Sequence, residues 1–565
     1  MPRQAKNILF IMFDQLRFDY LSCYGHPHLH TPHMDKLATR GVRFTNAYVQ
    51  SPVCGSSRMS YYTGRYVDSH GASWNGIPLR VGEMTLGDHL RQLGMDAWLI
   101  GKTHMRPDKE GMARLGLDPD SMIGARVAEC GFDTFERDDG LWPEGPDGSY
   151  DPGEPPRYNR HLQEKGYDSD NPWLDYANAG VTDEGEIASG WLMQHASKPA
   201  NIREEDSETP YMTSRCIEFI DQYGQDDSKP WLCHLSYIKP HWPYIVPAPY
   251  HNMYSKEHIQ PPNRAESERD DPHPVYEQFM NNAIGQAFRR DDVLESVIPA
   301  YMGLIKQGDD QLGRLFKHLE ETGRMDDTVI VITSDHGDYM GDHWLGEKDL
   351  FHEPSVKVPL IIYDPSAEAD ATRGMVCDEL VESIDLAATF VEMAGGMLEN
   401  ERDHVLEGRS LMPLLRGEDV EWRDYVISEY DYSVTPAAVK LEVAPRDARL
   451  FMVADHRWTY VNAALGGFRP MLFDRENDPQ ELNDLGASTA VEHVEIMALM
   501  EERLTAWGRR LSQRTSRSEN GVLKMRGASR RKGIVLGLYD GSEAPAELTE
   551  RFRGKVRQRF DQPAG

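Results

Sequence analysis

Short apolar runs that alternate with helix-periodic stretches restrict the fold of this chain more than any other feature. Five such runs, each bounded by turn residues, occupy 7–13, 96–101, 231–237, 328–333 and 360–363. Before the fourth run, apolar residues recur at helical spacing and predict one long amphipathic helix over 301–321. Strands joined by crossover helices form a doubly wound, mostly parallel α/β sheet, in which ligands bind at the carboxyl ends of the strands.

The pattern changes after Gly395 and Gly396. Strand-like runs at 449–454, 458–461 and 470–473 are separated by turn residues and predict an antiparallel sheet, with a helix over 492–507 packed against it. We therefore expect a catalytic α/β domain over 1–395 and a smaller C-terminal α+β subdomain over 396–511. The stretch 139–175 is rich in Pro, Gly, Asp and aromatic residues and lacks a period, which predicts a long surface insertion near the functional site.

Charge and cysteine content limit the partners and the compartment. The chain has 92 acidic and 61 basic residues and a net charge of −31, so it repels polyanions such as nucleic acid. Its six cysteines show no close pair or repeated spacing, unlike a disulfide framework. The apolar run that ends at Asp14 is too short for a signal peptide or a membrane span. We expect a cytoplasmic protein with no membrane partner.

The end of the chain has the opposite charge. Residues 512–565 contain twelve basic and six acidic residues, a net charge of +6. Such a segment could bind RNA or another anionic surface, but the acidic character of the rest of the chain favours an arm that lies on a partner subunit. The sequence therefore predicts a basic C-terminal arm over 512–565 and a homodimer or homotetramer.

Polar residues follow four of the predicted strands. They are Asp14-Gln15, Gly101-Lys102-Thr103-His104, Lys239-Pro240-His241 and Ser334-Asp335-His336-Gly337-Asp338. Any one of them alone is more often a helix cap or a turn. Because all four lie at strand ends of one predicted sheet, we expect them to meet in one crevice.

Two groups of residues in this set suggest chemistry. Asp14, Gln15, Asp335 and His336 offer oxygens and one nitrogen, which suit Ca²⁺, Mg²⁺ or Mn²⁺ better than a structural zinc, although Asp-His-Gly alone also fits a tight turn. Cys54 lies in a small-residue turn before a short predicted helix. Its thiol and the Arg58 guanidinium can face one oxyanion there. A bare cysteine is equally often an inert small hydrophobic residue.

The segment Cys54-Gly55-Ser56-Ser57-Arg58, followed by Thr63-Gly64-Arg65, resembles the sulfatase signature Cys-x-Pro/Ala-x-Arg followed by Thr-Gly. In that signature the cysteine is converted to formylglycine; Ser56 departs from the usual Pro or Ala. Five further parts of the chain resemble elements of the same family: Gly101–His104, Pro240–Tyr244, Asp335–Asp338, Lys348 and the pattern over 472–485. The resemblance covers residues 7–490 in order, and the combination is more specific than any single piece.

The resemblance implies an alkaline-phosphatase-like fold and a set of roles. Position 54 would be a formylglycine, made by the formylglycine-generating machinery, whose hydrated aldehyde is both nucleophile and metal ligand. Asp14, Gln15, Asp335 and His336 would complete the site of one divalent metal, Ca²⁺ or Mn²⁺. Arg58 and Lys102 would hold the diol, and Lys102, Lys348 and His241 would neutralise the transferring group. His241 or Lys348 would protonate the leaving oxygen, and His104 would act as the base that restores the aldehyde.

The resemblance leaves the substrate open. Gln15 and His336 replace the Asp and Asn common in arylsulfatases and look closest to phosphonate monoester hydrolases, whereas Lys102 and His104 follow sulfatases. We expect hydrolysis of sulfate monoesters of the arylsulfatase type, with promiscuity toward phosphonate monoesters and phosphodiesters. One alternative makes the phosphonate monoester or phosphodiester the native substrate, and another is a non-catalytic anion-binding protein.

Overall fold

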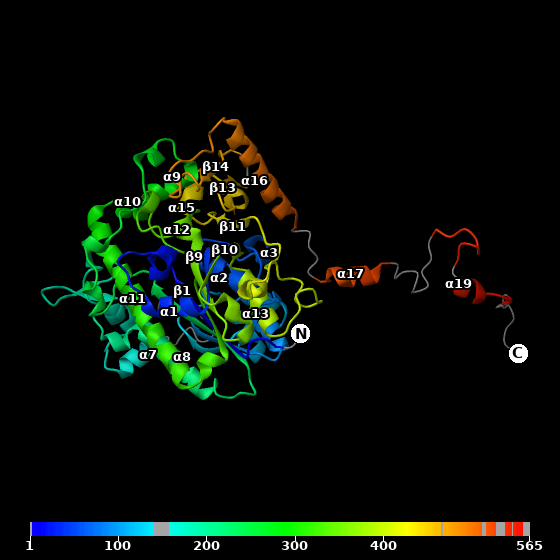
Figure 1. Ribbon diagram of the computed structural model, residues 1–565, viewed down its shortest axis with the longest axis horizontal. Helices are drawn as coiled ribbons and strands as arrows, with labels where there is room; N and C mark the ends of the chain where they lie inside the picture. Colours follow the sequence, from blue (N-terminus) through cyan, green and yellow to red (C-terminus); the bar gives the residue numbers. More distant parts are fainter. Residues whose placement is uncertain are drawn as a thin grey trace. The chain divides into compact units, whose positions relative to one another are not determined.

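The computed structural model describes residues 3–140, 157–464, 467–510, 516–526, 537–544 and 546–556. Its internal contacts separate two units, one of Met1–Leu398 with Leu406–Gln513 and one of Glu399–Val405 with Arg514–Gly565. The first unit contains every strand of the main sheet and of the smaller sheet (Figure 1). Residues 141–156 of the predicted insertion over 139–175 lie outside the described residues. The rest of it contains the helix α7 (Arg157–Glu164).

The main sheet has eight strands in the order β10-β2-β9-β8-β1-β7-β3-β4. Only β9 runs antiparallel to its neighbours, so the sheet is mostly parallel, and the predicted fold class is confirmed. The strands are β1 (Asn7–Asp14), β2 (Val42–Tyr48), β3 (Asp96–Gly101), β4 (Asp133–Arg137), β7 (Trp231–Pro240), β8 (Thr328–Ser334), β9 (Lys357–Tyr363) and β10 (Met375–Glu382).

Side chains of the central strand β1 alternate between two apolar cores, as the pleat of a strand requires. Phe10 faces one core and packs against Tyr61 of α2 (Cys54–Thr63) and Phe390 of α13 (Asp385–Met393). Leu9, Ile11 and Phe13 face the other core, with side chains of α1 (Pro32–Arg40), α8 (Glu208–Gln222) and α11 (Asp291–Glu321). The sheet is thus covered by helices on both faces (Figure 1). This arrangement fixes α2 directly against the central strands.

The helix predicted over 301–321 begins ten residues earlier in the structure, at Asp291. Pro299 lies inside the helix, where a proline normally marks a boundary, and this explains the late predicted start. Strands β2, β4 and β10 were not predicted. Their sequences, such as Val42–Tyr48 with Arg43 and Asn46, mix charged and apolar residues, because partly exposed strands lack a continuous apolar run.

The smaller sheet is antiparallel, with the order β11-β12-β13-β14, as predicted for the C-terminal region. Its strands are β11 (Val426–Asp431), β12 (Arg449–Ala454), β13 (Trp458–Ala463) and β14 (Met471–Asp474). The helix α16 (Val491–Arg509) packs on it through Met500 and Trp507, which share a core with Trp458 and Tyr460 (Figure 1, top). The boundary at residues 395 and 396 stays a prediction, since both sheets belong to one compact unit.

All six cysteines are free. Among the described residues, no helix combines the length and the apolar character that a membrane span requires.

Candidate active site

Cys54 is the first residue of α2 and is fully buried. Val53 before it is extended, and the helix ends at Gly64, whose φ of 64° places it in the left-handed region that favours glycine. The amide of Gly55 donates to Asn75 Oδ1 at 2.7 Å, which satisfies one of the free amides at the helix start. The helix N-terminus therefore holds residue 54 at the carboxyl ends of the central strands.

The strand register brings the other predicted residues to the same edge. Phe13 of β1 pairs with Ser334 of β8, and Asp14 pairs with Pro240 of β7. The residues that follow these pairs, Asp335 and His241, therefore lie next to Asp14. The convergence expected from the sequence follows from this register.

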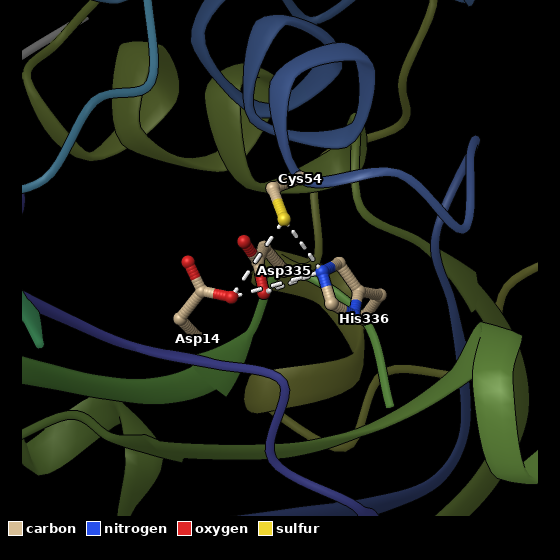
Figure 2. Close-up of side chains that lie close together, drawn as sticks. All are labelled: Asp14, Cys54, Asp335 and His336. Atoms are coloured by element: carbon tan, nitrogen blue, oxygen red, sulfur yellow. Dashed lines mark hydrogen bonds and ion pairs between the residues drawn. The ribbon is translucent and has the colours of Figure 1, made fainter. Parts of the chain in front are cut away.

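Four side chains form a compact cluster of metal-binding donors. Figure 2 shows the thiol of Cys54 pointing toward Asp14, Asp335 and His336. Cys54 Sγ lies 2.9 Å from His336 Nε2 and 3.7 Å from Asp14 Oδ1, and His336 Nε2 lies 3.6 Å from Asp335 Oδ1. The donor atoms all lie within 4.8 Å of one another and every residue is buried. Two carboxylates, an imidazole and position 54 around one point fit a divalent cation.

Gln15 adds an amide oxygen to this cluster. Its Nε2 donates to the hydroxyl of Tyr244 at 3.1 Å and to the carboxylate of Asp338, and its Oε1 accepts from Lys348 Nζ at 3.2 Å. Because both amide protons are engaged on one side, the carbonyl oxygen faces the Lys348 and Cys54 side. The predicted ligand set of Asp14, Gln15, Asp335 and His336 is therefore compatible with the geometry.

The cations Arg58 and Lys102 pair with the carboxylates of the cluster. Arg58 donates to Asp335 Oδ2 at 2.8 Å and to Asp14 Oδ2 at 3.2 Å, and Lys102 Nζ lies 2.5 Å from Asp14 Oδ2. Burial would raise the pKa of Asp14, but Lys102, His241 and Arg58 hold it well below its usual value. Arg58 thus holds both ligand carboxylates in place, and together with Lys102 it keeps Asp14 ionised. Its contact with a diol at position 54 stays a prediction.

Lys348 and His241 lie on the open side of residue 54. Lys348 Nζ is 3.2 Å from Cys54 Sγ and 3.2 Å from His241 Nε2. Burial and the charge of Lys348 lower the pKa of His241 well below its usual value. Burial opposes the charge of Lys348, but Cys54 and Glu347 raise its pKa above the usual value. The pair therefore holds its proton on Lys348 and a neutral imidazole on His241.

His104 approaches position 54 from the loop after β3. Its side chain forms a hydrogen bond with Cys54, and burial together with Lys102 lowers its pKa. A cavity of about 320 Å³ lies over residue 54 and includes His104, Lys102, His241 and Lys348 in its wall. The residues predicted for the site lie in this wall or in the cluster beneath it, and Arg58 lies behind them, paired with Asp14 and Asp335.

The cavity wall also contains residues that the sequence reasoning missed. They are Trp74, Asn75, Arg106, Arg137, Asp139 and Glu347. Trp74 and Asn75 belong to a loop without a recognised motif, and no sequence signal singled them out. Glu347 could have been found from the sequence, because it directly precedes the predicted site residue Lys348. Its carboxyl has a pKa raised to about 7 by burial.

Comparisons with known proteins agree with this geometry. Residues 6–397 match the family model described as Sulfatase, and residues 341–509 match the one described as N-sulphoglucosamine sulphohydrolase, C-terminal. The chain belongs to the sulfatase family. It is therefore a hydrolase of the sulfatase family and has the alkaline-phosphatase-like fold.

Individual relatives of this sulfatase fall in more than one activity class. It is 30% identical over 526 residues to the multifunctional alkaline phosphatase superfamily protein PehA of Trinickia caryophylli, covering 86% of this chain and 92% of that protein. It is 28% identical to an arylsulfatase of Clostridium perfringens, covering 85% and 90%. The structure of a phosphonate monoester hydrolase from Silicibacter pomeroyi superposes with a TM-score of 0.76 at 28% identity, covering 90% and 96%.

Proposed function

We propose that this sulfatase hydrolyses sulfate monoesters of the arylsulfatase type through a formylglycine at position 54, with side activity on phosphonate monoesters and phosphodiesters. The observation that carries the proposal is the place of Cys54. Its Sγ lies 2.9 Å from His336 Nε2 and 3.2 Å from Lys348 Nζ, beneath the cavity. A nucleophile there faces a metal-binding cluster on one side and proton donors on the other.

One divalent metal, Ca²⁺ or Mn²⁺, would be held by Asp14, Gln15, Asp335, His336 and the side chain of residue 54. When bound, it acidifies the attacking hydroxyl and polarises an oxygen of the sulfate group. The aldehyde at position 54 would come from oxidation of the thiol by the formylglycine-generating machinery.

In the first step, one hydroxyl of the hydrated aldehyde gives up its proton to water, and its oxygen attacks sulfur while the bond from sulfur to the alcohol oxygen breaks. The leaving oxygen takes its proton from Lys348 or His241, which lie 3.2 Å apart over residue 54. Lys102 and Lys348 balance the negative charge on the transferring group. Residue 54 then carries one sulfate ester and one free hydroxyl.

In the second step, His104 takes the proton from the free hydroxyl. The electron pair of the O–H bond forms the carbonyl bond, the bond from carbon to the sulfate oxygen breaks, and sulfate leaves with the electron pair of that broken bond. Water then adds to the aldehyde and restores the diol. This order requires His104 close to residue 54, which agrees with the hydrogen bond between the two side chains.

The alternative of a phosphonate monoester or phosphodiester as the native substrate is favoured by Gln15 and His336 and by similarity to a phosphonate monoester hydrolase. Lys102 and His104 favour the sulfate ester. A non-catalytic anion-binding protein is a third reading. This alternative has little support, because the chain belongs to a family of hydrolases and keeps Lys102, His104 and Lys348 around the position of the nucleophile.

The proposal is tested by peptide mass spectrometry of the segment that contains residue 54. We expect a mass that corresponds to formylglycine or its hydrate, and Cys54→Ala should lose all hydrolysis while it folds normally. An unmodified thiol in active protein, or full activity of Cys54→Ala, would contradict the mechanism. The ratio of kcat/KM for matched aryl sulfate and aryl phosphonate esters then decides between the two substrate classes.

A further inference from the structure

The loop that carries Lys102 and His104 is anchored by a residue that the proposed function does not use. The backbone amides of Thr103 and His104 both donate to Asp139 Oδ1, at 3.1 and 3.0 Å. Asp139 lies two residues beyond the end of β4, the edge strand next to β3, and its side chain is 13% exposed. One carboxylate oxygen therefore holds two consecutive amides of the loop.

Asp139 is in turn held by Arg137 at the end of β4. Arg137 Nε donates to Asp139 Oδ2 at 3.0 Å, Nη2 donates to the carbonyl of Met105 at 2.9 Å, and Nη1 forms an ion pair with Glu129. Burial would raise the pKa of Asp139, but Arg137 and His104 lower it to about 2. The carboxylate is thus charged at neutral pH. One of its oxygens is held by the loop amides and the other by Arg137.

His104 needs such an anchor. Its φ of 57° lies in the left-handed region, which costs free energy for a residue other than glycine and persists only where neighbouring contacts impose it. The ring Nδ1 of His104 is buried and has no hydrogen-bond partner among the described residues. Since no hydrogen bond from the described part of the chain holds this nitrogen, the direction of the ring toward residue 54 depends on the backbone that Asp139 holds.

We propose that Asp139, held by Arg137, is a positioning residue that aims His104 at residue 54 for the release of the transferred group. This inference rests on the proposed function, in which His104 removes the proton of the free hydroxyl. The attack on sulfur uses residue 54, Lys348 and His241, which lie on other elements than the loop that Asp139 holds. It also uses Lys102 of that loop, but the ion pair with Asp14 holds the Lys102 ammonium independently of Asp139. Loss of Asp139 therefore slows release from residue 54 more than transfer onto it.

The test compares Asp139→Ala and Asp139→Asn in rapid mixing with 4-nitrophenyl sulfate. For the alanine variant we expect a burst of one nitrophenol per active site followed by turnover slower by about 100-fold, the scale of a positioned base. Acid quench followed by peptide mass spectrometry should find the sulfate ester on residue 54. The asparagine variant keeps an amide oxygen for the loop but loses the charge, so its turnover should be intermediate. Because asparagine has nearly the same shape as aspartate, this variant still tests the proposal if the alanine variant does not fold.

Two controls separate the possible results. His104→Ala should accumulate the same ester, and Asp133→Ala should behave like the unaltered protein. Asp133 is the first residue of β4, and its carboxylate also pairs with an arginine, Arg126. If His104→Ala accumulates the ester and both Asp139 variants release it at the unaltered rate, the positioning role is wrong and the proposed function stands. If His104→Ala hydrolyses substrate with no ester on residue 54, the proposed function itself fails.

Discussion

The imidazole of His241 is held in one tautomer by the backbone beside it. Its Nδ1 lies 2.8 Å from the carbonyl of Trp242, an acceptor only, so Nδ1 carries the proton. Nε2 then offers a lone pair to Lys348 Nζ at 3.2 Å. Of the two candidates for the acid, only Lys348 then brings a proton to this contact, and we propose that Lys348 protonates the leaving oxygen while His241 orients the ammonium.

We expect Lys348→Ala to lower kcat/KM by about 100-fold or more for aryl sulfates with poor leaving groups, the range of general acid catalysis. The loss should be smaller for nitrophenyl esters, because a stable leaving anion needs no proton. The measurement is the slope of log kcat/KM against the pKa of the leaving phenol. A slope that stays equal in Lys348→Ala and the unaltered protein would assign the proton transfer to another group. His241→Ala serves as the comparison and should steepen the slope less.

At the scale of single residues, the sequence could indicate those that follow strands or belong to motifs. Asp14, Lys102 and Asp335 were predicted for this reason. Asp139 and Asn75 were not, because each acts through a hydrogen bond to the backbone amide of a residue distant in sequence. A carboxylate that accepts from an amide 35 residues away leaves no periodic signal.

Among the elements, the turn after β8 shows why the Asp-His-Gly sequence needs its glycine. A Cβ at Gly337 would lie 1.9 Å from the carbonyl oxygen of Pro354 in α12 (Glu353–Val356). The amide of Gly337 also donates to Ser355 O at 2.8 Å, so the turn presses directly on that helix. A side chain at this point displaces Asp335 and His336 together.

Gly337→Ala should therefore weaken the metal site as well as the fold. We expect a free energy of unfolding lower by about 1–3 kcal/mol, as in other overpacked sites, and an affinity for Ca²⁺ or Mn²⁺ at least about tenfold lower. Calorimetric titration of chelator-stripped protein and thermal unfolding measure the two effects. The control is Gly508→Ala in α16, where a Cβ meets nothing within 4 Å and helix propensity favours alanine. Unchanged metal affinity in Gly337→Ala would show that the turn adapts.

The element order was predictable where apolar runs are continuous and not where strands are partly exposed. β1, β3, β7, β8 and β9 are buried along most of their length and were predicted from their apolar runs. β10 has exposed positions next to buried ones, and its pattern depends on pairing with β2, which sequence periodicity does not encode. The strand pairing beyond the central strands is thus a tertiary property.

For the whole molecule, charge and exposed apolar surface argue for self-association through the C-terminal segment. The net charge of +6 over 512–565 leaves −37 on the rest of the chain. In the described parts of this segment, Leu523, Met525, Tyr539, Phe552 and Val556 are large apolar side chains exposed to solvent. Exposed apolar side chains gathered in a short basic stretch fit a surface that is covered by another chain. We propose that this arm binds the acidic body of a second copy.

Ending the chain after residue 511 tests this arm. We expect the full chain to show the mass of a dimer or tetramer in light scattering, and the shortened chain the mass of one copy, because both the charge and the apolar contacts are removed. Salt gives a second readout, since at about 1 M the screening length falls to about 3 Å and the attraction between arm and body weakens. The dissociation constant of the full chain should then rise while the shortened chain stays unchanged. An oligomer that survives the deletion would place the interface on the two sheets and their helices instead.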